Sequence, residues 1–120
     1  MLFYRSADQI LIDRGDLSRR ISIEKIPFLQ RRIIATARWL DTPVYVATNL
    51  LESMIIKKSP TRAEVNDVVS TLLMGANGLV LAAETAIGNH PVGAVQMIQK
   101  IIREADKWTP NSTPSEIIRS

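Results

Sequence analysis

The chain has 120 residues, of which 46% are hydrophobic and 22% are charged, and its formal net charge is +3. This length allows one domain with a modest core, and the composition excludes a disordered or fibrous chain. The sequence has no cysteine and one histidine, His90, which excludes disulfides, thiolate metal sites and a histidine cluster for a metal.

The positive charge is spread over three separate pairs, Arg19–Arg20, Arg31–Arg32 and Lys57–Lys58. Nucleic-acid-binding chains usually concentrate such charge and interleave aromatic residues, which do not lie beside these pairs. No run approaches the ~18 apolar residues of a membrane span, and the apolar start is too short for a signal peptide. We therefore expect no nucleic acid and no membrane as partners, and a cytoplasmic location.

The first predicted strand covers residues 9–13 and closes on Arg14, Gly15 and Asp16, where the glycine predicts a turn. A helix is predicted from Ile26 onward, because apolar residues recur at three- and four-residue steps. Its predicted buried stripe is Ile26, Leu29, Ile33, Ala37 and Leu40, and its predicted water-facing residues are Gln30, Arg31, Arg32 and Arg38.

The second predicted strand, 44–47, is a short apolar run that ends abruptly at Thr48 and Asn49. Such a run is typical of a buried parallel strand, and its carboxyl end is where α/β sheets place their sites. Thr61 and Glu64 have the spacing of a capping box, which predicts a helix that ends near Gly75. The predicted buried stripe of that helix is Val65, Val68, Val69, Leu72 and Leu73.

The third predicted strand covers 78–82 and closes on Ala83, Glu84 and Thr85. A last helix opens at Pro91, with a predicted buried stripe of Val95, Ile98, Ile102 and Ala105. After Trp108 the composition becomes linker-like, with Ile117 and Ile118 as a possible docking point. Residues 1–108 are thus expected to form one domain and 109–120 a polar tail. Three strands alternating with three helices predict an α/β fold of three parallel βα units.

Several stretches together resemble the carboxyl-terminal part of the (β/α)8 barrel of pyruvate kinase, over about residues 6–107. The stretches are 7–17, 23–27, 46–48, 51–54, 60–65 and 84–86 with Pro91. Their joint occurrence in this order is far more specific than any one of them. The resemblance implies a partial TIM barrel, about units six to eight of eight, since a complete barrel needs roughly 250 residues.

The resemblance also implies phosphoryl transfer from phosphoenolpyruvate to ADP with Mg2+, and K+ as a further candidate ion. Asp16 falls on the family's metal-binding aspartate, and Gly15 and Asp16 on the turn that approaches the substrate carboxylate. Thr48 falls on a threonine beside the substrate, and Thr48 and Glu84 are the candidate catalytic residues. Mg2+ needs oxygen ligands, and fixed cations and N–H dipoles stabilise a transferring phosphoryl group.

The chain departs from the family pattern at several positions. The family strand that carries a catalytic lysine and a second metal carboxylate lies before the first residue. Ala82 and Ala83 replace a serine and a glycine, and Asp13, Ser18, Asn49 and Ile87 stand where other residue types are usual. We therefore expect the isolated chain to be catalytically incompetent.

Other interpretations remain open for the candidate residues. Asp16 could only cap its turn, Thr48 could only bond the next turn, and Glu84 could form an ion pair with Arg14 or Arg62. The chain could be a non-catalytic binding or assembly module that kept the fold, or a fragment of a longer protein. Its helices can cover one face of the sheet only, so a homo-oligomer, a missing barrel half, or its own tail or amino-terminal residues should cover the remainder.

Overall fold

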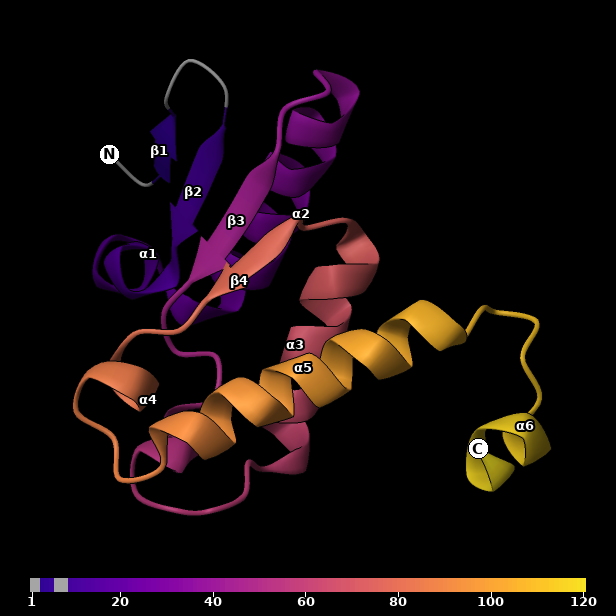
Figure 1. The fold of residues 1–120 in the computed structure, drawn as a ribbon. Helices are drawn as coiled ribbons and strands as arrows, with labels where there is room; N and C mark the ends of the chain where they lie inside the picture. Colours follow the sequence, from indigo (N-terminus) through magenta and orange to yellow (C-terminus); the bar gives the residue numbers. More distant parts are fainter. Residues whose placement is uncertain (1–2, 6–8) are drawn as a thin grey trace.

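The computed structural model describes residues 3–5 and 9–120 of the chain (Figure 1). Its elements, in chain order, are β1 (Phe3–Arg5), β2 (Ile10–Asp13), α1 (Arg14–Arg20), the 3-10 helix η1 (Ile23–Lys25), α2 (Ile26–Trp39), β3 (Val44–Ala47), the 3-10 helix η2 (Glu52–Ile55), α3 (Arg62–Met74), β4 (Gly78–Val80), α4 (Ala83–Ala86), α5 (Pro91–Lys107) and α6 (Pro114–Arg119).

The strands form one sheet in the order β1-β2-β3-β4. β2 pairs with β3 and β3 pairs with β4, both in parallel. In this register Asp13 is opposite Ala47, and Ala47 is opposite Val80, so the three strands end at nearly the same level. The predicted three parallel βα units are therefore confirmed, and their carboxyl ends share one rim.

β1 is a strand that the sequence pattern did not predict. It runs antiparallel to β2, with Phe3 opposite Ile12 and Arg5 opposite Ile10. β1 covers the outer edge of β2, which three parallel strands alone would leave unpaired. Pairing by amino-terminal residues was one of the outcomes expected for an incomplete barrel.

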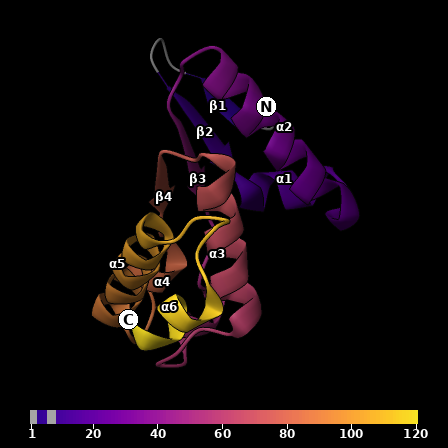
Figure 2. The same cartoon turned by 90° about the vertical axis from the view of Figure 1, so that its right-hand side faces the viewer.

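The core consists of two clusters that meet at Leu79 of β4. One cluster joins a face of the sheet to α1 and α2, and its buried members are Ile10, Ile12, Leu17, Ile34, Ala37, Val44 and Val46. The other joins the β3–η2 segment to α3 and α5, and its buried members are Leu50, Leu51, Met54, Val68, Ala94, Ile98 and Ile101. Figure 2 shows α3 and α5 adjacent to each other.

Gly15 lies inside a helix, and the turn predicted there is wrong. α1 begins directly after β2, because the side chain of Asp13 accepts the N–H of Asp16 and caps the helix. In α2, Gln30 was predicted to face water but is buried, since its Nε2 donates to Thr71 Oγ1 of α3 at 3.2 Å. Leu40, predicted to be buried, is 53% exposed.

The buried face of α5 is rotated from the one predicted. Ile98 is buried as predicted, but its buried neighbours are Ala94 and Ile101, whereas Val95 and Ile102 are 41% and 36% exposed. Apolar residues occupy more than one stripe of this helix, so its contacts with α3, α4 and η2 decide which stripe is covered. Leu73 of α3 is likewise exposed, although the predicted end of α3 at Gly75 is confirmed by a left-handed φ of 108°.

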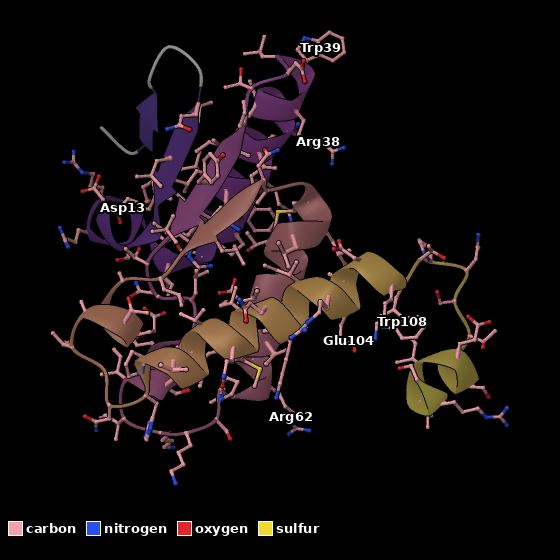
Figure 3. All side chains as sticks on the ribbon, viewed as in Figure 1. Asp13, Arg38, Trp39, Arg62, Glu104 and Trp108 are labelled. Carbon is pink, nitrogen blue, oxygen red and sulfur yellow. The ribbon has the colours of Figure 1, made fainter. Side chains whose placement is uncertain are left out.

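The tail contains a short helix, α6, rather than only a linker. Its first turn is capped by the side chain of Thr113, which accepts the N–H of Glu116. Ile117 and Ile118 are 46% and 83% exposed, so in the single chain neither residue of the suggested docking point is buried. Just before the tail, the Trp108 indole N–H donates to Glu104 at 2.7 Å (Figure 3). In the described part of the chain, no helix is long and apolar enough to cross a membrane.

The second face of the sheet carries less cover than the face that packs on α2. Leu11 and Tyr45 on this face are half-buried, and Val80 is 43% exposed. Gly78 lies under the Tyr45 ring, because a Cβ at this position would lie 2.6 Å from Cδ1 of Tyr45. The predicted one-sided covering of the sheet is thus confirmed for the described residues.

We expect the 120-residue chain to self-associate at micromolar concentration through this face and the free edge of β4. Sedimentation velocity should show species heavier than 13.4 kDa, and Val80→Lys should shift them toward the monomer, because a charge on an edge strand opposes pairing. Leu73→Lys is the control, since Leu73 is an exposed residue of α3. A homogeneous monomer in the unmodified chain would contradict the expectation.

Candidate functional site at the carboxyl ends of the strands

A hollow of about 230 Å³ lies where β2, β3 and β4 end. Its lining comes from the segments that follow all three strands: Asp13, Gly15, Arg19, Thr48, Asn49, Glu52, Ile55, Ala82, Ala83 and Glu84. We call this the rim hollow. The parallel register creates it, because loops that leave parallel strands at one level must surround a common space.

Thr48 connects β3 to the first turn of α1. Its Oγ1 accepts the N–H of Gly15 at 2.6 Å, and its hydroxyl donates to Oδ1 of Asp13 at 3.2 Å. A Cβ at Gly15 would lie 3.3 Å from Oγ1 of Thr48 and from Oδ1 of Asp13. Glycine therefore permits a close approach of α1 to these two oxygens, for which a larger residue would need them to shift.

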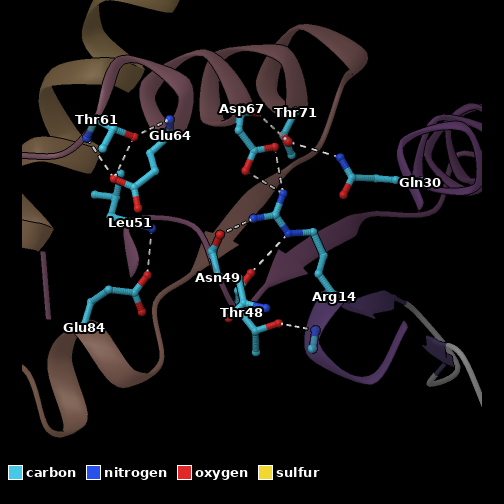
Figure 4. A network of polar contacts seen from close by, with 11 residues as sticks. Arg14, Gln30, Thr48, Asn49, Leu51, Thr61, Glu64, Asp67, Thr71 and Glu84 are labelled. Atoms are coloured by element: carbon cyan, nitrogen blue, oxygen red, sulfur yellow. Dashed lines mark hydrogen bonds and ion pairs between the residues drawn. The ribbon is translucent and has the colours of Figure 1, made fainter. Parts of the chain in front are cut away.

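Arg14 holds the segment that follows β3 (Figure 4). Its Nε donates to the carbonyl of Thr48 at 3.1 Å, and its Nη2 donates to the carbonyl of Asn49 at 2.6 Å. Its Nη1 lies 2.8 Å from both carboxylate oxygens of Asp67 on α3. One side chain thus joins the end of β2, the end of β3 and α3.

Glu84 is 1% exposed and has backbone donors on both carboxylate oxygens. Oε2 accepts the N–H of Leu51 at 2.9 Å, and Oε1 accepts the N–H of Ala82 at 3.0 Å. The ion pair that the sequence suggested with Arg14 or Arg62 is therefore wrong for Arg14, which pairs with Asp67. Glu84 instead ties together the segments that follow β3 and precede α4.

Glu64 fixes η2 to the start of α3. The predicted capping box is confirmed: Thr61 Oγ1 accepts the Glu64 N–H, and Glu64 accepts the Thr61 N–H. The same carboxylate accepts the N–H and hydroxyl of Ser53. Burial acts to raise the pKa of Glu64, but the hydrogen bonds from Ser53 and Thr61 together lower it below its ordinary value of 4.5.

Asp16 lies beside the rim hollow and does not belong to its lining. Its Oδ1 accepts from Nε of Arg20 at 3.2 Å, while its Oδ2 is buried without a hydrogen-bond partner. An orphaned carboxylate oxygen is a chemically suitable metal ligand. Within residues 3–5 and 9–120, however, no three acidic or histidine side chains are grouped to hold a metal ion. Asp16 can therefore supply one ligand of a Mg2+ site, but these residues do not complete it.

Of the candidate site residues Gly15, Asp16, Thr48 and Glu84, which were expected at one rim, the structure brings Gly15, Thr48 and Glu84 together in the lining of the rim hollow and leaves Asp16 outside it. Sequence reasoning missed the role of Asp13, which caps α1 and bonds Thr48. It also missed the pair of Arg14 and Asp67. The residues of that pair are 53 positions apart, and no local spacing signals the contact.

The fold and the rim together define a segment of a parallel α/β barrel with polar groups at the carboxyl ends of its strands. The family model described as pyruvate kinase, barrel domain, matches residues 3–95. The chain therefore belongs to the pyruvate kinase family.

Three curated relatives illustrate the match. Pyruvate kinase of Thermotoga maritima is 46% identical over 84% of this chain, and pyruvate kinase 2 of a Synechocystis strain is 41% identical over 94%. Pyruvate kinase of Mycobacterium tuberculosis is 43% identical over 89%. The alignments cover 22%, 19% and 23% of these relatives, so the chain spans about a fifth of their length.

We expect Glu64→Gln to destabilise the chain near neutral pH and to have little effect in acid. The lowered pKa of Glu64 means that its carboxylate stabilises the fold above the pKa of the unfolded chain, about 4.5. That stabilisation is lost as the pH falls through the lower, folded pKa. Urea unfolding of both proteins from pH 7 to pH 3 should show their midpoints converge, whereas a constant difference would contradict this. Glu116→Gln, in α6, is the matched control.

Proposed function

We propose that this chain forms part of the active-site rim of a pyruvate kinase, which transfers a phosphoryl group from phosphoenolpyruvate to ADP in glycolysis. The observation that carries the proposal is the convergence of Gly15, Thr48 and Glu84 on one hollow at the strand ends. Family membership supports the reaction class. The chain alone is proposed to be catalytically incompetent, because the described residues include no complete metal site and the resemblance implies a lysine from another strand.

Thr48 is the proposed contact to the substrate, with Gly15 beside it. The Thr48 hydroxyl and the Gly15 N–H lie within 2.6 Å of each other and border the hollow, so a ligand oxygen could exchange for either partner. Glu84 remains a candidate catalytic residue, although its oxygens accept two backbone N–H groups. Its established contacts support a role in fixing the loops that surround the substrate.

Asp16 is the proposed Mg2+ ligand, through the oxygen that has no hydrogen-bond partner. When bound, Mg2+ would neutralise negative charge on the phosphoryl group, and K+ could add to this. Further oxygen ligands would have to come from substrate, water and other residues, since Mg2+ prefers six. A homo-oligomer, supported by the less covered second face of the sheet and the free edge of β4, is part of this proposal, as is a cytoplasmic location.

We expect the chain to bind phosphoenolpyruvate weakly, and only with Mg2+. Calorimetric titrations at millimolar ligand, with and without Mg2+, should show this dependence, and Asp16→Asn should abolish it by removing the charge on the metal ligand. Asp106→Asn, on the exposed surface of α5, is the control. Metal-independent binding or none would favour a non-catalytic module. Rapid pyruvate formation with ADP and Mg2+ would contradict the proposed incompetence.

Asp13→Asn should strengthen the binding of phosphoenolpyruvate by roughly fivefold to tenfold, because it removes a negative charge from the lining of the hollow. Asparagine keeps an oxygen that can accept from Asp16 and Thr48, so the cap of α1 is preserved. Asp41→Asn removes the same charge at the opposite end of the sheet, before β3 begins, and should leave the affinity unchanged. Equal effects of both variants in the same titration would show that net charge alone matters.

A further inference from the structure

Two consecutive residues after β3 adopt a backbone conformation that their side chains disfavour. Thr48 has φ of 70° and Asn49 has φ of 57°, both in the left-handed region. Asparagine tolerates this region, but a β-branched threonine rarely adopts it. Such a conformation persists only where surrounding contacts over-determine it. The contacts that hold it here must therefore be identifiable.

Arg14 supplies those contacts. Its Nε and Nη2 donate to the carbonyls of Thr48 and Asn49, the same two residues, at 3.1 and 2.6 Å. The Arg14 side chain is 11% exposed, and its bond to the Thr48 carbonyl is partly shielded from water. A guanidinium is planar and places its N–H groups in a fixed fork, and two carbonyls that fit this fork are locked relative to each other. A lysine ammonium has no such fork.

Asp67 fixes the direction of the fork. Both of its carboxylate oxygens lie 2.8 Å from Nη1 of Arg14, which leaves Nε and Nη2 for the two carbonyls. Asp67 is itself connected to the packed helices, because its carbonyl accepts from Thr71 and Thr71 accepts from Gln30 of α2 (Figure 4). The backbone after β3 is thus held from two helices that do not line the hollow.

We propose that Arg14 and Asp67 are positioning residues, which force Thr48 and Asn49 into the left-handed conformation and thereby place the Thr48 hydroxyl in the rim hollow. The backbone direction at Thr48 determines where its Oγ1 lies, and Oγ1 lies 2.6 Å from the Gly15 nitrogen. The consequence for substrate binding rests on the proposed function. The control of backbone conformation does not, so the two can fail separately.

Arg14→Lys is the central test, because it keeps the charge and removes the fork. A positive φ gives a strong intraresidue NOE between the amide proton and Hα, which can be measured on the labelled full chain. We expect this NOE at Thr48 and Asn49 in the unmodified protein and its weakening in Arg14→Lys. Asp67→Asn should weaken it less, since one oxygen remains to accept from Nη1. Arg31→Lys, on the exposed surface of α2, should leave it unchanged.

A rescue variant separates positioning from general destabilisation. Glycine adopts positive φ without steric cost, so Arg14→Lys with Asn49→Gly should recover part of the NOE at Thr48. If Arg14→Lys weakened the NOE only by destabilising the fold, the added glycine would not restore it. Unchanged NOEs in both Arg14→Lys and Asp67→Asn would overturn the proposal, as would a rescue variant that shows no recovery. If Arg14→Lys does not fold, Asp67→Asn alone decides between these outcomes.

Titration with phosphoenolpyruvate and Mg2+ then connects the geometry to the site. We expect Arg14→Lys to bind roughly tenfold more weakly than the unmodified chain, with partial recovery in the rescue variant. Absent binding in the unmodified chain would remove the proposed function but leave the NOE result standing. Normal binding in Arg14→Lys, together with retained NOEs, would overturn the positioning role and leave the proposed function intact.

Discussion

The parallel pairing of β2, β3 and β4 is the constraint on which the rest of the structure depends. Its register places Asp13, Ala47 and Val80 side by side, so the three following segments leave the sheet at one level. Backbone bonds extend the pairing at the opposite end, from Ile10 N to the Pro43 carbonyl at 2.9 Å and from Asn77 N to the Val44 carbonyl at 2.8 Å. A register shift of one residue would move the side chains of the shifted strand to the opposite face of the sheet and separate the groups at the rim.

Charged side chains at the rim act mainly on the backbone. Glu84 accepts from two backbone N–H groups, Glu64 accepts from those of Ser53 and Thr61, and Arg14 donates to two carbonyls. Loops without regular structure leave such groups unpaired, and burying them unpaired is costly. Charge-assisted bonds offset that cost and give the loops one conformation. A charged residue that the sequence suggests for catalysis, such as Glu84, therefore also fixes the loops that form the site.

Local sequence signals predicted the helices and strands. Contacts between residues far apart in the sequence determine which of their side chains are buried. The capping box at Thr61 and the helix end at Gly75 depend on neighbouring residues only, and both were predicted correctly. The buried stripe of α5 depends on three other elements, and it was misassigned because apolar residues lie on more than one face. The prediction that Gln30 faces water failed because its hydrogen-bond partner, Thr71, is 41 residues away in the sequence. A glycine directly after a strand is typical of a turn, but the cap that Asp13 supplies to Asp16 starts a helix there instead.

The rim hollow is built by contacts among the three βα units. A chain that spans about a fifth of the length of its relatives can therefore form it. The side-chain bonds of Thr48 and Glu84 at the hollow join residues within the sequence 13–84, and α1 and α2 support the strands from one face of the sheet. A metal site has a different requirement, because several oxygen ligands must converge on one point. Asp16 provides one oxygen without a partner, and the described residues provide no cluster around it. The lining of the hollow can therefore come from these units alone, whereas the described residues leave a metal site around Asp16 incomplete.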